Sequence, residues 1–390
     1  MNLPLRTLAD MPMQRGMRLL IRIDGDVTMK GKRIADDFRI EQAVPTIKEA
    51  LRRGAHVRII SHRGRPHGTR VASLTQRPVA EHLSKLLKKE IIFVKDPLSI
   101  AVFKKLNLSS DILFFENIRF FAGEEENDAS FARRLARWGD AYINEAFANS
   151  HRSHASMVAL ARTLPSYAGI RLEKEIANLS RVITAPDHPL VAILGGAKLE
   201  TKIPLIKRFL TFADDVLIGG AIANTLLAAK GFPVGKSLVD KDQGDIVSLL
   251  SHKKLHIPID VVVTKSLSRP SGVRSCPVSN VAVNEYIVDI GPETVAFFSS
   301  VIKASSMVVW NGPVGLAEVP LFANGTRHLA TSMKRLSAFK LIGGGDTITL
   351  LHSYGALKGF SYVSTGGGAM LEFLAGTRMP ALDVLEGPLK

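Results

Sequence analysis

The second half of the chain repeats one local pattern five times, and this repetition limits the fold more than any other feature. Each repeat is a short apolar run that stops at a glycine-containing segment, and helix-compatible sequence follows it. These segments are residues 195–196, 219–220, 311–313, 343–346 and 364–368. A short apolar run is typical of a buried strand, and glycine permits a tight turn into the next helix. The repetition predicts a second parallel sheet with glycine at most of its strand ends.

The first of these turns also carries charge. In the stretch Val191–Lys202, two glycines follow an apolar run, and residues 197–202 suit a helix. Lys198 and Lys202 are four residues apart, so a helix would place them on one face, an arrangement that favours a polyphosphate between them. A plain strand-to-helix turn with two solvated lysines fits this stretch equally well. Asp346 follows three glycines and is suited to Mg²⁺, which prefers one or two carboxylates together with phosphate oxygens.

The first half alternates strands, polar basic loops and helices. We expect strands at 19–23, 56–60, 91–94, 111–115 and 141–143, and helices at 40–53, 78–89 and 129–138. Such alternation predicts a mostly parallel sheet covered by helices on both faces, with its binding crevice at the carboxyl ends of the strands. Those ends and the adjoining junctions carry Asp24, Arg39, His62, Arg63, Arg65, Arg119, His151 and Arg152.

The arginines of this first half suit anion recognition. The planar guanidinium binds carboxylates and phosphates through two parallel hydrogen bonds, so several at neighbouring strand ends predict a socket for a small, doubly anionic molecule. The alternative is that the arginines only decorate a solvated rim and that His62, His151 and His154 are ordinary structural histidines. No His or Cys spacing here indicates a metal site.

Two half-sites on two domains favour phosphoryl transfer, with closure needed to bring donor and acceptor together. The helical pattern from Ile170 to Ser180 ends before Pro186 and is the natural connection between the domains. A length of 390 residues with 46% hydrophobic content also favours two domains. We therefore expect an α/β protein with mostly parallel sheets.

The composition limits which other classes of protein this chain could belong to. A net charge of +15 raises the alternative of a nucleic-acid-binding protein, but the basic residues are dispersed and a field that attracts small phosphorylated anions explains the same charge. A single cysteine, Cys276, excludes an internal disulfide framework and a cysteine-rich zinc site. Neither a signal peptide nor an apolar run of about 18 residues is evident, so we expect a soluble cytoplasmic protein.

Several ordered motifs resemble those of one family. They are residues 36–39, 61–66, 116–120, 151–156, 195–198, 310–313, 343–347 and 364–368. With these motifs the chain resembles the phosphoglycerate kinases from about Arg22 to Leu374, nearly its whole length. The resemblance implies reversible phosphoryl transfer between Mg-ATP and 3-phosphoglycerate, giving ADP and 1,3-bisphosphoglycerate. Most members are monomers, and we expect the same here.

The resemblance also implies a domain plan and a set of site residues. Members fold as two Rossmann-like domains joined by a hinge helix, here a phosphoglycerate-binding domain at 1–168 and a hinge with nucleotide-binding domain at 169–374, while residues from about 375 to 390 return to the first domain. The acceptor residues would be Asp24, Asp26, Arg39, His62, Arg63, Gly64, Arg65, Arg119 and Arg152. The nucleotide residues would be Gly196, Lys198, Lys202, Gly220, Asn311, Glu318, Gly344, Gly345, Asp346, Thr347 and Gly366. Arg39, Lys198 and Lys202 would be catalytic, and Asp346 would bind Mg²⁺.

Three departures from the family pattern stand out. Residues 24–28 read Asp-Gly-Asp-Val-Thr where members usually have Asp-Phe-Asn-Val-Pro, so Asp26 adds a carboxylate beside the acceptor. At about 4 Å the repulsion between two such charges is roughly 1 kcal/mol in water and about 4 kcal/mol near a protein surface. We hypothesise that Arg63, where leucine is more usual, compensates Asp26; a shifted carboxylate acceptor is the alternative. Glu145 replaces the usual aspartate.

Overall fold

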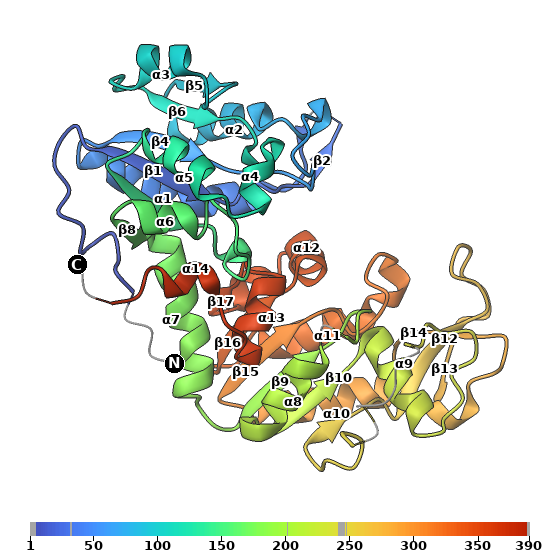
Figure 1. Ribbon diagram of the computed structural model, residues 1–390. Helices are drawn as coiled ribbons and strands as arrows, with labels where there is room; N and C mark the ends of the chain where they lie inside the picture. Colours follow the sequence, from blue (N-terminus) through green and yellow to red (C-terminus); the bar gives the residue numbers. More distant parts are fainter. Residues whose placement is uncertain (1–4, 32, 201, 241–245, 247, 388–390) are drawn as a thin grey trace. The chain divides into compact units, whose positions relative to one another are not determined.

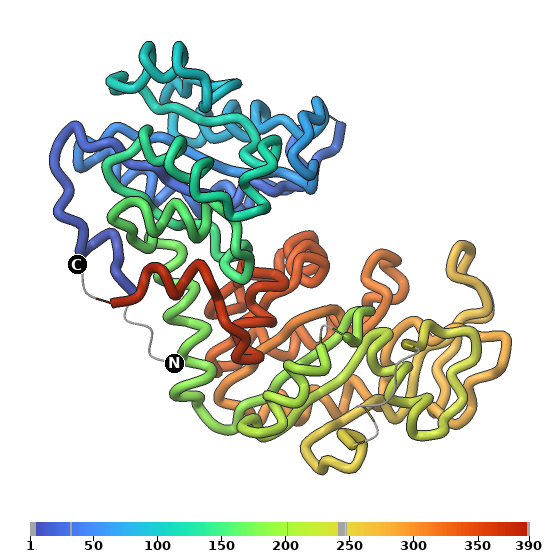
Figure 2. Tube along the Cα trace, in the orientation of Figure 1, coloured from blue at the N-terminus to red at the C-terminus, as the bar shows by residue number. Residues whose placement is uncertain are grey.

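The computed structural model describes residues 5–31, 33–200, 202–240, 246 and 248–387. The chain forms two compact units, drawn in Figures 1 and 2. Unit 1 comprises the residues up to Ala177 together with the segment that begins at Arg378, and unit 2 comprises Asn178–Thr377. The boundary after Ala177 lies inside helix α7, Ile170–Thr184, which matches the helix expected from the sequence.

Unit 1 contains a six-stranded sheet in the order β5-β6-β4-β1-β7-β8. Every neighbouring pair is parallel, as the alternation of strands and helices predicts. The strands are β1 Arg18–Ile23, β4 His56–Ile60, β5 Ile91–Val94, β6 Ile112–Phe115, β7 Ala141–Glu145 and β8 Ser166–Ala168. Residues Met29–Lys30 and Arg33–Ile34 form a two-stranded antiparallel hairpin, β2 and β3.

Helices cover both faces of this sheet because successive strand residues point to opposite sides. Leu19 and Ile21 of β1 belong to the core cluster that also holds α1 and α2, whereas Leu20 belongs to the cluster of α3, α5 and α6. The helices are α1 Phe38–Arg52, α2 Arg77–Leu87, α3 Ile100–Leu106, α4 Ala122–Glu125, α5 Ala129–Ala136 and α6 Ala159–Thr163. The polar loops therefore emerge between the two helical layers, at the carboxyl ends of the strands.

The C-terminal segment of the chain lies against the N-terminal segment within unit 1. The backbone amide of Arg6 donates to the carbonyl of Leu385 at 3.1 Å, and Ala381 donates to Ser150 at 3.2 Å. The short helix α14, Pro380–Asp383, belongs to this segment. Ala381 packs with Met157 and Val158, so the segment completes the apolar core beneath the loop that follows β7.

Unit 2 contains a second six-stranded parallel sheet, in the order β11-β10-β9-β15-β16-β17. Its strands are β9 Leu190–Leu194, β10 Asp215–Ile218, β11 Leu255–His256, β15 Met307–Asn311, β16 Phe339–Gly343 and β17 Tyr362–Val363. Its helices are α8 Ile203–Phe212, α9 Gly220–Ala229, α10 Pro292–Lys303, α11 Asn324–Met333, α12 Gly345–Ser353 and α13 Gly368–Ala375. All five glycine-containing segments follow strands of this sheet, which confirms the prediction made from their repetition.

A three-stranded antiparallel sheet also belongs to unit 2, and the sequence pattern did not reveal it. Its order is β13-β12-β14, from β12 Asp260–Thr264, β13 Arg274–Pro277 and β14 Tyr286–Ile290. Val261, Val263 and Cys276 bury their side chains in a small core with Leu227 of α9. This arrangement places β14 beside the turns at the carboxyl ends of β9 and β10.

The expected helix over residues 197–202 is wrong. Only α8 follows β9, and it begins at Ile203, so Lys198 precedes the helix and Lys202 is its N-cap residue. Pro204 lies in the first turn of α8. Proline is favoured there because its missing N–H would have no partner in the helix, so it marks the helix start after the lysines rather than before them. Lys198 and Lys202 therefore do not share a helix face.

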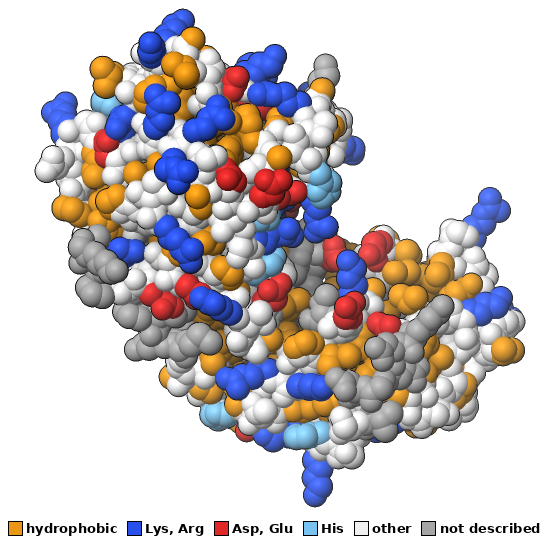
Figure 3. Space-filling model, viewed as in Figure 1, with side chains coloured by type: hydrophobic (Ala, Val, Ile, Leu, Met, Phe, Trp, Pro, Cys, Tyr) orange, Lys and Arg blue, Asp and Glu red, His pale blue; other side chains and the backbone are white. Residues whose placement is uncertain are grey.

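Two further findings concern the classes raised by the composition. No helix among the described residues is long and apolar enough to cross a membrane. On the face drawn in Figure 3, lysine and arginine side chains are scattered over each unit instead of forming one basic stripe. The face drawn therefore lacks the continuous basic stripe that a nucleic-acid groove would need.

Candidate active site

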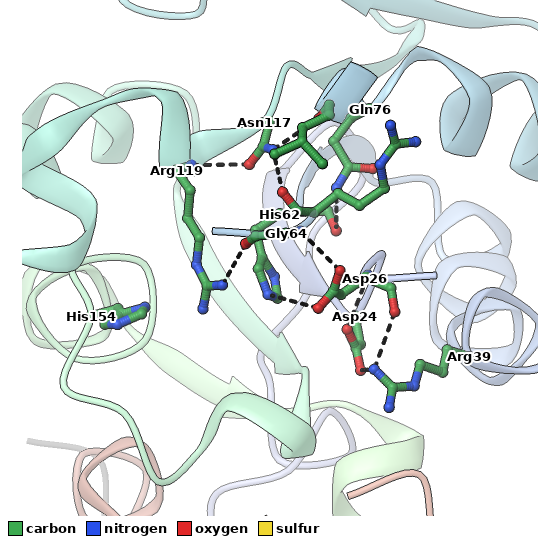
Figure 4. A network of polar contacts seen from close by, with 12 residues as sticks. Asp24, Asp26, Arg39, His62, Gly64, Gln76, Asn117, Arg119 and His154 are labelled. Carbon is green, nitrogen blue, oxygen red and sulfur yellow. Dashed lines mark hydrogen bonds and ion pairs between the residues drawn. The ribbon is translucent and has the colours of Figure 1, made fainter. Parts of the chain in front are cut away.

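The predicted acceptor residues of unit 1 meet at the carboxyl ends of neighbouring strands. Asp24 follows β1, His62 and Gly64 follow β4, and Arg119 follows β6 in a short 3₁₀ turn. In Figure 4, His62 lies between Arg119 on one side and Asp26 on the other. Because parallel strands bring these ends to one edge, residues almost a hundred positions apart in the sequence become neighbours.

Arg39, at the start of α1, is held by both aspartates of the loop after β1. Its Nη1 lies 3.2 Å from Oδ2 of Asp24 and also donates to the backbone carbonyl of Asp26 at 3.2 Å. The Asp24 side chain is buried, whereas the Arg39 side chain is about one-third exposed. The guanidinium is therefore anchored at one end and accessible at the other, which suits a group that contacts a substrate.

Asp26 supports the loop after β4. Its Oδ1 accepts the backbone N–H of Gly64 at 2.9 Å, and its Oδ2 lies 3.9 Å from Nε2 of His62. Gly64 has φ +63°, a conformation that glycine adopts without strain. The carboxylate of Asp26 thus faces the same space as the imidazole of His62, where a bound anion would meet its charge.

Arg63 does not pair directly with Asp26. Its Nη2 donates to the carbonyl of Ser73, and its Nη1 has no hydrogen-bond partner among the described residues. Burial lowers the pKa of Arg63, and the carboxylates of Asp26 and Glu116 oppose that effect from a distance. Any compensation of Asp26 by Arg63 therefore acts through space and not through a hydrogen bond.

Arg119 is a buried arginine with unused donors. Its Nη1 donates to the carbonyl of Gly64 at 2.8 Å, while Nη2 has no hydrogen-bond partner in the described part of the chain. Burial, together with the positive charges of Arg22 and Arg152, lowers its pKa to about 10. Nε of Arg119 already lies 3.7 Å from Oε1 of Glu125, and its unpaired Nη2 is free to donate to a bound anion.

His151 and His154 lie in the same positively charged environment as Arg119. Burial, followed by repulsion from Arg119 and Arg152, lowers the pKa of His151 to about 4 and that of His154 to about 3. Both rings are therefore neutral near pH 7. The excess of positive charge falls on the arginines alone, as expected for a socket that receives more than one negative charge. Arg65 is exposed and Arg152 half-buried at its edge.

In unit 2, two of the glycine turns pack directly on each other. A Cβ at Gly195 would lie 2.1 Å from the carbonyl oxygen of Pro313, and one at Gly312 would lie 2.2 Å from that of Gly195. The amide of Gly195 donates to the carbonyl of Asn311 at 2.9 Å. Only glycine permits this approach, so the turns after β9 and β15 form one rigid backbone surface.

Lys202 is buried beside these turns. Its Nζ donates to Oδ1 of Asn311, and burial lowers its pKa to about 7. Nδ2 of Asn311 and Oγ1 of Thr347 are buried without a hydrogen-bond partner among the described residues, and both lie near Gly344. Near the start of α12, the two unpaired polar groups of Asn311 and Thr347 are features of an anion site that a phosphate would complete, and the ammonium of Lys202 at the start of α8 contacts one of them.

A cavity of about 280 Å³ adjoins this surface. Its wall is mostly apolar, with Ala223, Leu238 and Tyr286, and it suits a flat aromatic group. Of the predicted nucleotide residues, Gly196, Gly220, Glu318 and Asp346 line it, while Lys198 and Gly366 do not. Lys202, Asn311 and Thr347 lie at the neighbouring phosphate-type site described above.

A metal ion would have to use few protein ligands. No group of three or more His, Cys, Asp or Glu side chains within the described residues could hold one. Asp346, in the first turn of α12, is a single carboxylate beside the unpaired hydroxyl of Thr347. This donor set fits Mg²⁺ carried by phosphate oxygens better than a metal bound by the protein alone.

The sequence did not predict a role in the site for three buried residues of unit 1. Arg22 lies inside β1, Glu124 in α4, and Ser156 in the loop after β7, and all are fully buried. A charged residue within an otherwise apolar strand was the available signal for Arg22, because such a residue must have partners. Its partners Ser156 and His62 lie 134 and 40 positions away in the sequence, so no local pattern identifies them.

Comparison with known proteins gives one family. The family model described as phosphoglycerate kinase matches residues 8–377. A phosphoglycerate kinase from Zymomonas mobilis is 39% identical over 393 residues, which cover 98% of this chain and 99% of that protein. One from Pelotomaculum thermopropionicum is 40% identical, over 95% of this chain and 96% of that protein.

Comparison with solved structures gives the same family. The phosphoglycerate kinase of Coxiella burnetii superimposes with a TM-score of 0.86 at 36% identity, covering 98% of this chain and 99% of that one. The enzyme from Pyrococcus horikoshii gives 0.85 at 30% identity, covering 98% of each chain. The similarity therefore extends through both units.

Proposed function

The chain belongs to the phosphoglycerate kinase family, and we propose that it transfers a phosphoryl group reversibly between ATP and the carboxyl group of 3-phosphoglycerate. The observation that carries this proposal is the acceptor socket of unit 1. Arg119 is buried there with an unused donor, and His151 and His154 are neutral because of burial and, second, repulsion from Arg119 and Arg152. A molecule with a carboxylate and a phosphate supplies the negative charge that this socket lacks.

We assign the acceptor to unit 1 and the nucleotide to unit 2. Arg39, His62, Arg65, Arg119 and Arg152 would bind the phosphoglycerate, with Asp24 holding Arg39 in place. The apolar cavity of about 280 Å³ would take the nucleobase, and Glu318 at its wall would reach the ribose. Lys202, Asn311 and Thr347 would receive the phosphates.

Mg²⁺ accompanies the nucleotide in this proposal. Asp346 would be its protein ligand, and the ion would neutralise the charge that develops on the phosphate oxygens. The unpaired hydroxyl of Thr347, beside it, would bind a phosphate oxygen.

The residues supply charge and orientation and not proton transfer. The acceptor carboxylate is already ionised near pH 7, so it can attack the γ-phosphorus without a general base. Arg39 from one unit and Lys202 from the other would neutralise the three equatorial oxygens of the transition state. Losing one such group typically lowers the rate about a hundred-fold to a thousand-fold.

A coupled kinase assay with Mg-ATP and 3-phosphoglycerate tests the proposal. Wild-type protein should turn over, and Arg39→Ala should abolish most of the activity. Arg133 on α5 is exposed and is not one of the residues assigned to the socket, so Arg133→Ala is the matched control for loss of one arginine. Folded wild-type protein that binds Mg-ATP but does not phosphorylate 3-phosphoglycerate would overturn the assignment of the acceptor.

A further inference from the structure

The carboxylate of Glu124 is completely buried, yet the transfer reaction has no use for it. It lies in α4, behind the acceptor socket of unit 1. Its Oε1 accepts the hydroxyl of Ser156 at 2.7 Å, and its Oε2 accepts the backbone N–H of Ser156 at 2.9 Å. Two hydrogen bonds from one residue fix both the position of Ser156 and the direction of its hydroxyl proton.

Ser156 passes this orientation to Arg22. The Ser156 hydroxyl donates its only proton to Glu124, so its lone pairs are left for Nε of Arg22, which donates to it at 3.0 Å. Arg22 is fully buried, and its Nη1 donates to the carbonyl of Ile23. The guanidinium is planar and rigid, so these two contacts also set the direction of its remaining nitrogen, Nη2.

Arg22 in turn determines which nitrogen of His62 carries the proton. Nη2 of Arg22 lies 3.0 Å from Nδ1 of His62. Arginine can only donate, so Nδ1 must be the acceptor and the proton of the neutral ring must be on Nε2. Nε2 points toward Asp26 and the acceptor socket, as Figure 4 shows.

His62 is neutral in this environment. Burial and the positive charges of Arg22 and Arg119 hold its pKa well below the ordinary value. Its contribution to the socket is therefore a directed N–H donor and not a positive charge. A ring with the opposite tautomer would turn a lone pair toward the bound anion and repel it.

We propose that Glu124 and Ser156 are positioning residues, which act through Arg22 to hold His62 in the Nε2–H tautomer as a donor to the anionic acceptor. The proposal rests on the proposed function for the identity of that acceptor. The tautomer itself can be measured without any substrate, so the two can fail separately.

Nitrogen NMR of protein labelled with ¹⁵N-histidine tests the tautomer directly. The chain has 11 histidines, and His62→Gln identifies the signal of His62 by its absence. In folded wild-type protein we expect an unprotonated Nδ1 and a protonated Nε2. An Nδ1-protonated or fully charged ring in the wild type would overturn the proposal. The tautomer is measured on the wild-type protein, and His62→Gln serves only to assign the signal.

Two variants then test the positioning role. Ser156→Ala removes the link between Glu124 and Arg22, and Arg22→Gln offers Nδ1 an amide that can accept as well as donate. Both should give a mixture of tautomers and raise the KM for 3-phosphoglycerate about tenfold, with the KM for Mg-ATP unchanged. Ser130→Ala is the matched control, because Ser130 also donates to a carboxylate, that of Asp128, but at an exposed position.

The possible outcomes distinguish a failure of the positioning role from a failure of the proposed acceptor. An unchanged tautomer in a folded Ser156→Ala protein, or equal changes in both KM values, would overturn the positioning role. Absent turnover in a wild-type protein whose His62 shows the expected tautomer would instead count against the proposed acceptor.

Discussion

Arg39 and Asp24 form an ion pair in the acceptor socket, with 3.2 Å between Nη1 and Oδ2. The guanidinium of Arg39, which we propose acts on the transferred phosphoryl group, is thus paired with Asp24, and this pair fixes its position. Because Arg39 is about one-third exposed, solvent weakens the attraction.

A double-mutant cycle tests this pair. The free energy of unfolding should show a coupling of about 0.5–1 kcal/mol between Asp24→Asn and Arg39→Gln at low salt, since a partly exposed pair is screened. The coupling should shrink in about 1 M salt. Urea unfolding of the four proteins measures it, and strictly additive effects at low salt would show that the two charges do not interact.

Asp26 is expected to weaken acceptor binding. Its Oδ1 accepts the N–H of Gly64, and asparagine can keep that bond through its own Oδ1. Asp26→Asn therefore removes only a negative charge near the bound anion, a repulsion of roughly 1 kcal/mol or more. The KM for 3-phosphoglycerate should fall about fivefold while the KM for Mg-ATP stays constant. A raised KM for 3-phosphoglycerate would mean that the carboxylate contributes to recognition.

The same kinetics decide the role of Arg63. Since Arg63 donates to Ser73 and not to Asp26, we expect only weak coupling between Arg63→Leu and Asp26→Asn, about 0.5 kcal/mol or less. Strong coupling in the KM for 3-phosphoglycerate would restore direct compensation, as hypothesised from the sequence.

The lowered pKa of Lys202 predicts that nucleotide binding depends on pH. Burial lowers its pKa to about 7 in the ligand-free protein, and a bound phosphate favours the charged form. From about pH 7.5 to about pH 9 the nucleotide phosphates stay ionised, but binding must then add a proton to Lys202. The affinity for Mg-ADP should fall by up to about tenfold per pH unit in this window.

Calorimetry in buffers of different ionisation enthalpy measures that proton uptake. Lys202→Met should bind more weakly and should lose the pH dependence. The stability of ligand-free protein changes in the opposite sense. The unfolded chain binds more protons than the folded one between about pH 7 and about pH 10, so the contribution of Lys202 to stability rises with pH there. Binding of Mg-ADP to the wild type without proton uptake at about pH 8 would contradict the proposed contact between Lys202 and a phosphate.

The sequence predicted most of what is local in this fold. Strands such as β1 and β4 were placed within one residue, because a short apolar run that stops at a charge or glycine has few other interpretations. Helix α7 was also predicted, since its apolar spacing and the following proline agree. Parallel sheets follow from the alternation of such elements.

What the sequence missed depends on contacts between distant residues. The antiparallel sheet of β12–β14 is built from short strands whose pairing no local pattern specifies. The start of α8 depended on Pro204 and not on the helical propensity of residues 197–202. Lys202 contacts Asn311, and Arg22 contacts Ser156, across more than a hundred residues. The charges were visible in the sequence, but their partners were not.

Glu145 offers a test of how unit 1 holds the start of helix α7. Its carboxylate accepts the hydroxyl of Thr46 and, at 3.0 Å each, the first backbone amides of Arg171 and Leu172. A Cβ at Gly169 would lie 2.2 Å from Oε2, so the glycine leaves room for the glutamate. Burial nevertheless raises the pKa of Glu145 to about 7, despite these hydrogen bonds.

The sign of the resulting pH dependence follows from that shift. Between about pH 4.5 and about pH 7 the folded protein binds more protons at Glu145 than the unfolded chain, so this contribution to stability is complete below that window and is lost as the pH rises through it. A shift of this size corresponds to a loss on the order of 3 kcal/mol. Glu145→Gln does not titrate, so the difference in unfolding free energy between wild type and variant should change by that amount across the window.

Urea unfolding at a series of pH values measures the difference. Asp289, whose pKa burial also raises to about 7, is present in both proteins and cancels. Glu145→Asp provides a second variant that keeps the charge but is too short to reach both amides, so it should lose stability at every pH. Parallel stability curves for wild type and Glu145→Gln would mean that Glu145 stays ionised in the fold, and that its hydrogen bonds to the start of α7 outweigh its burial.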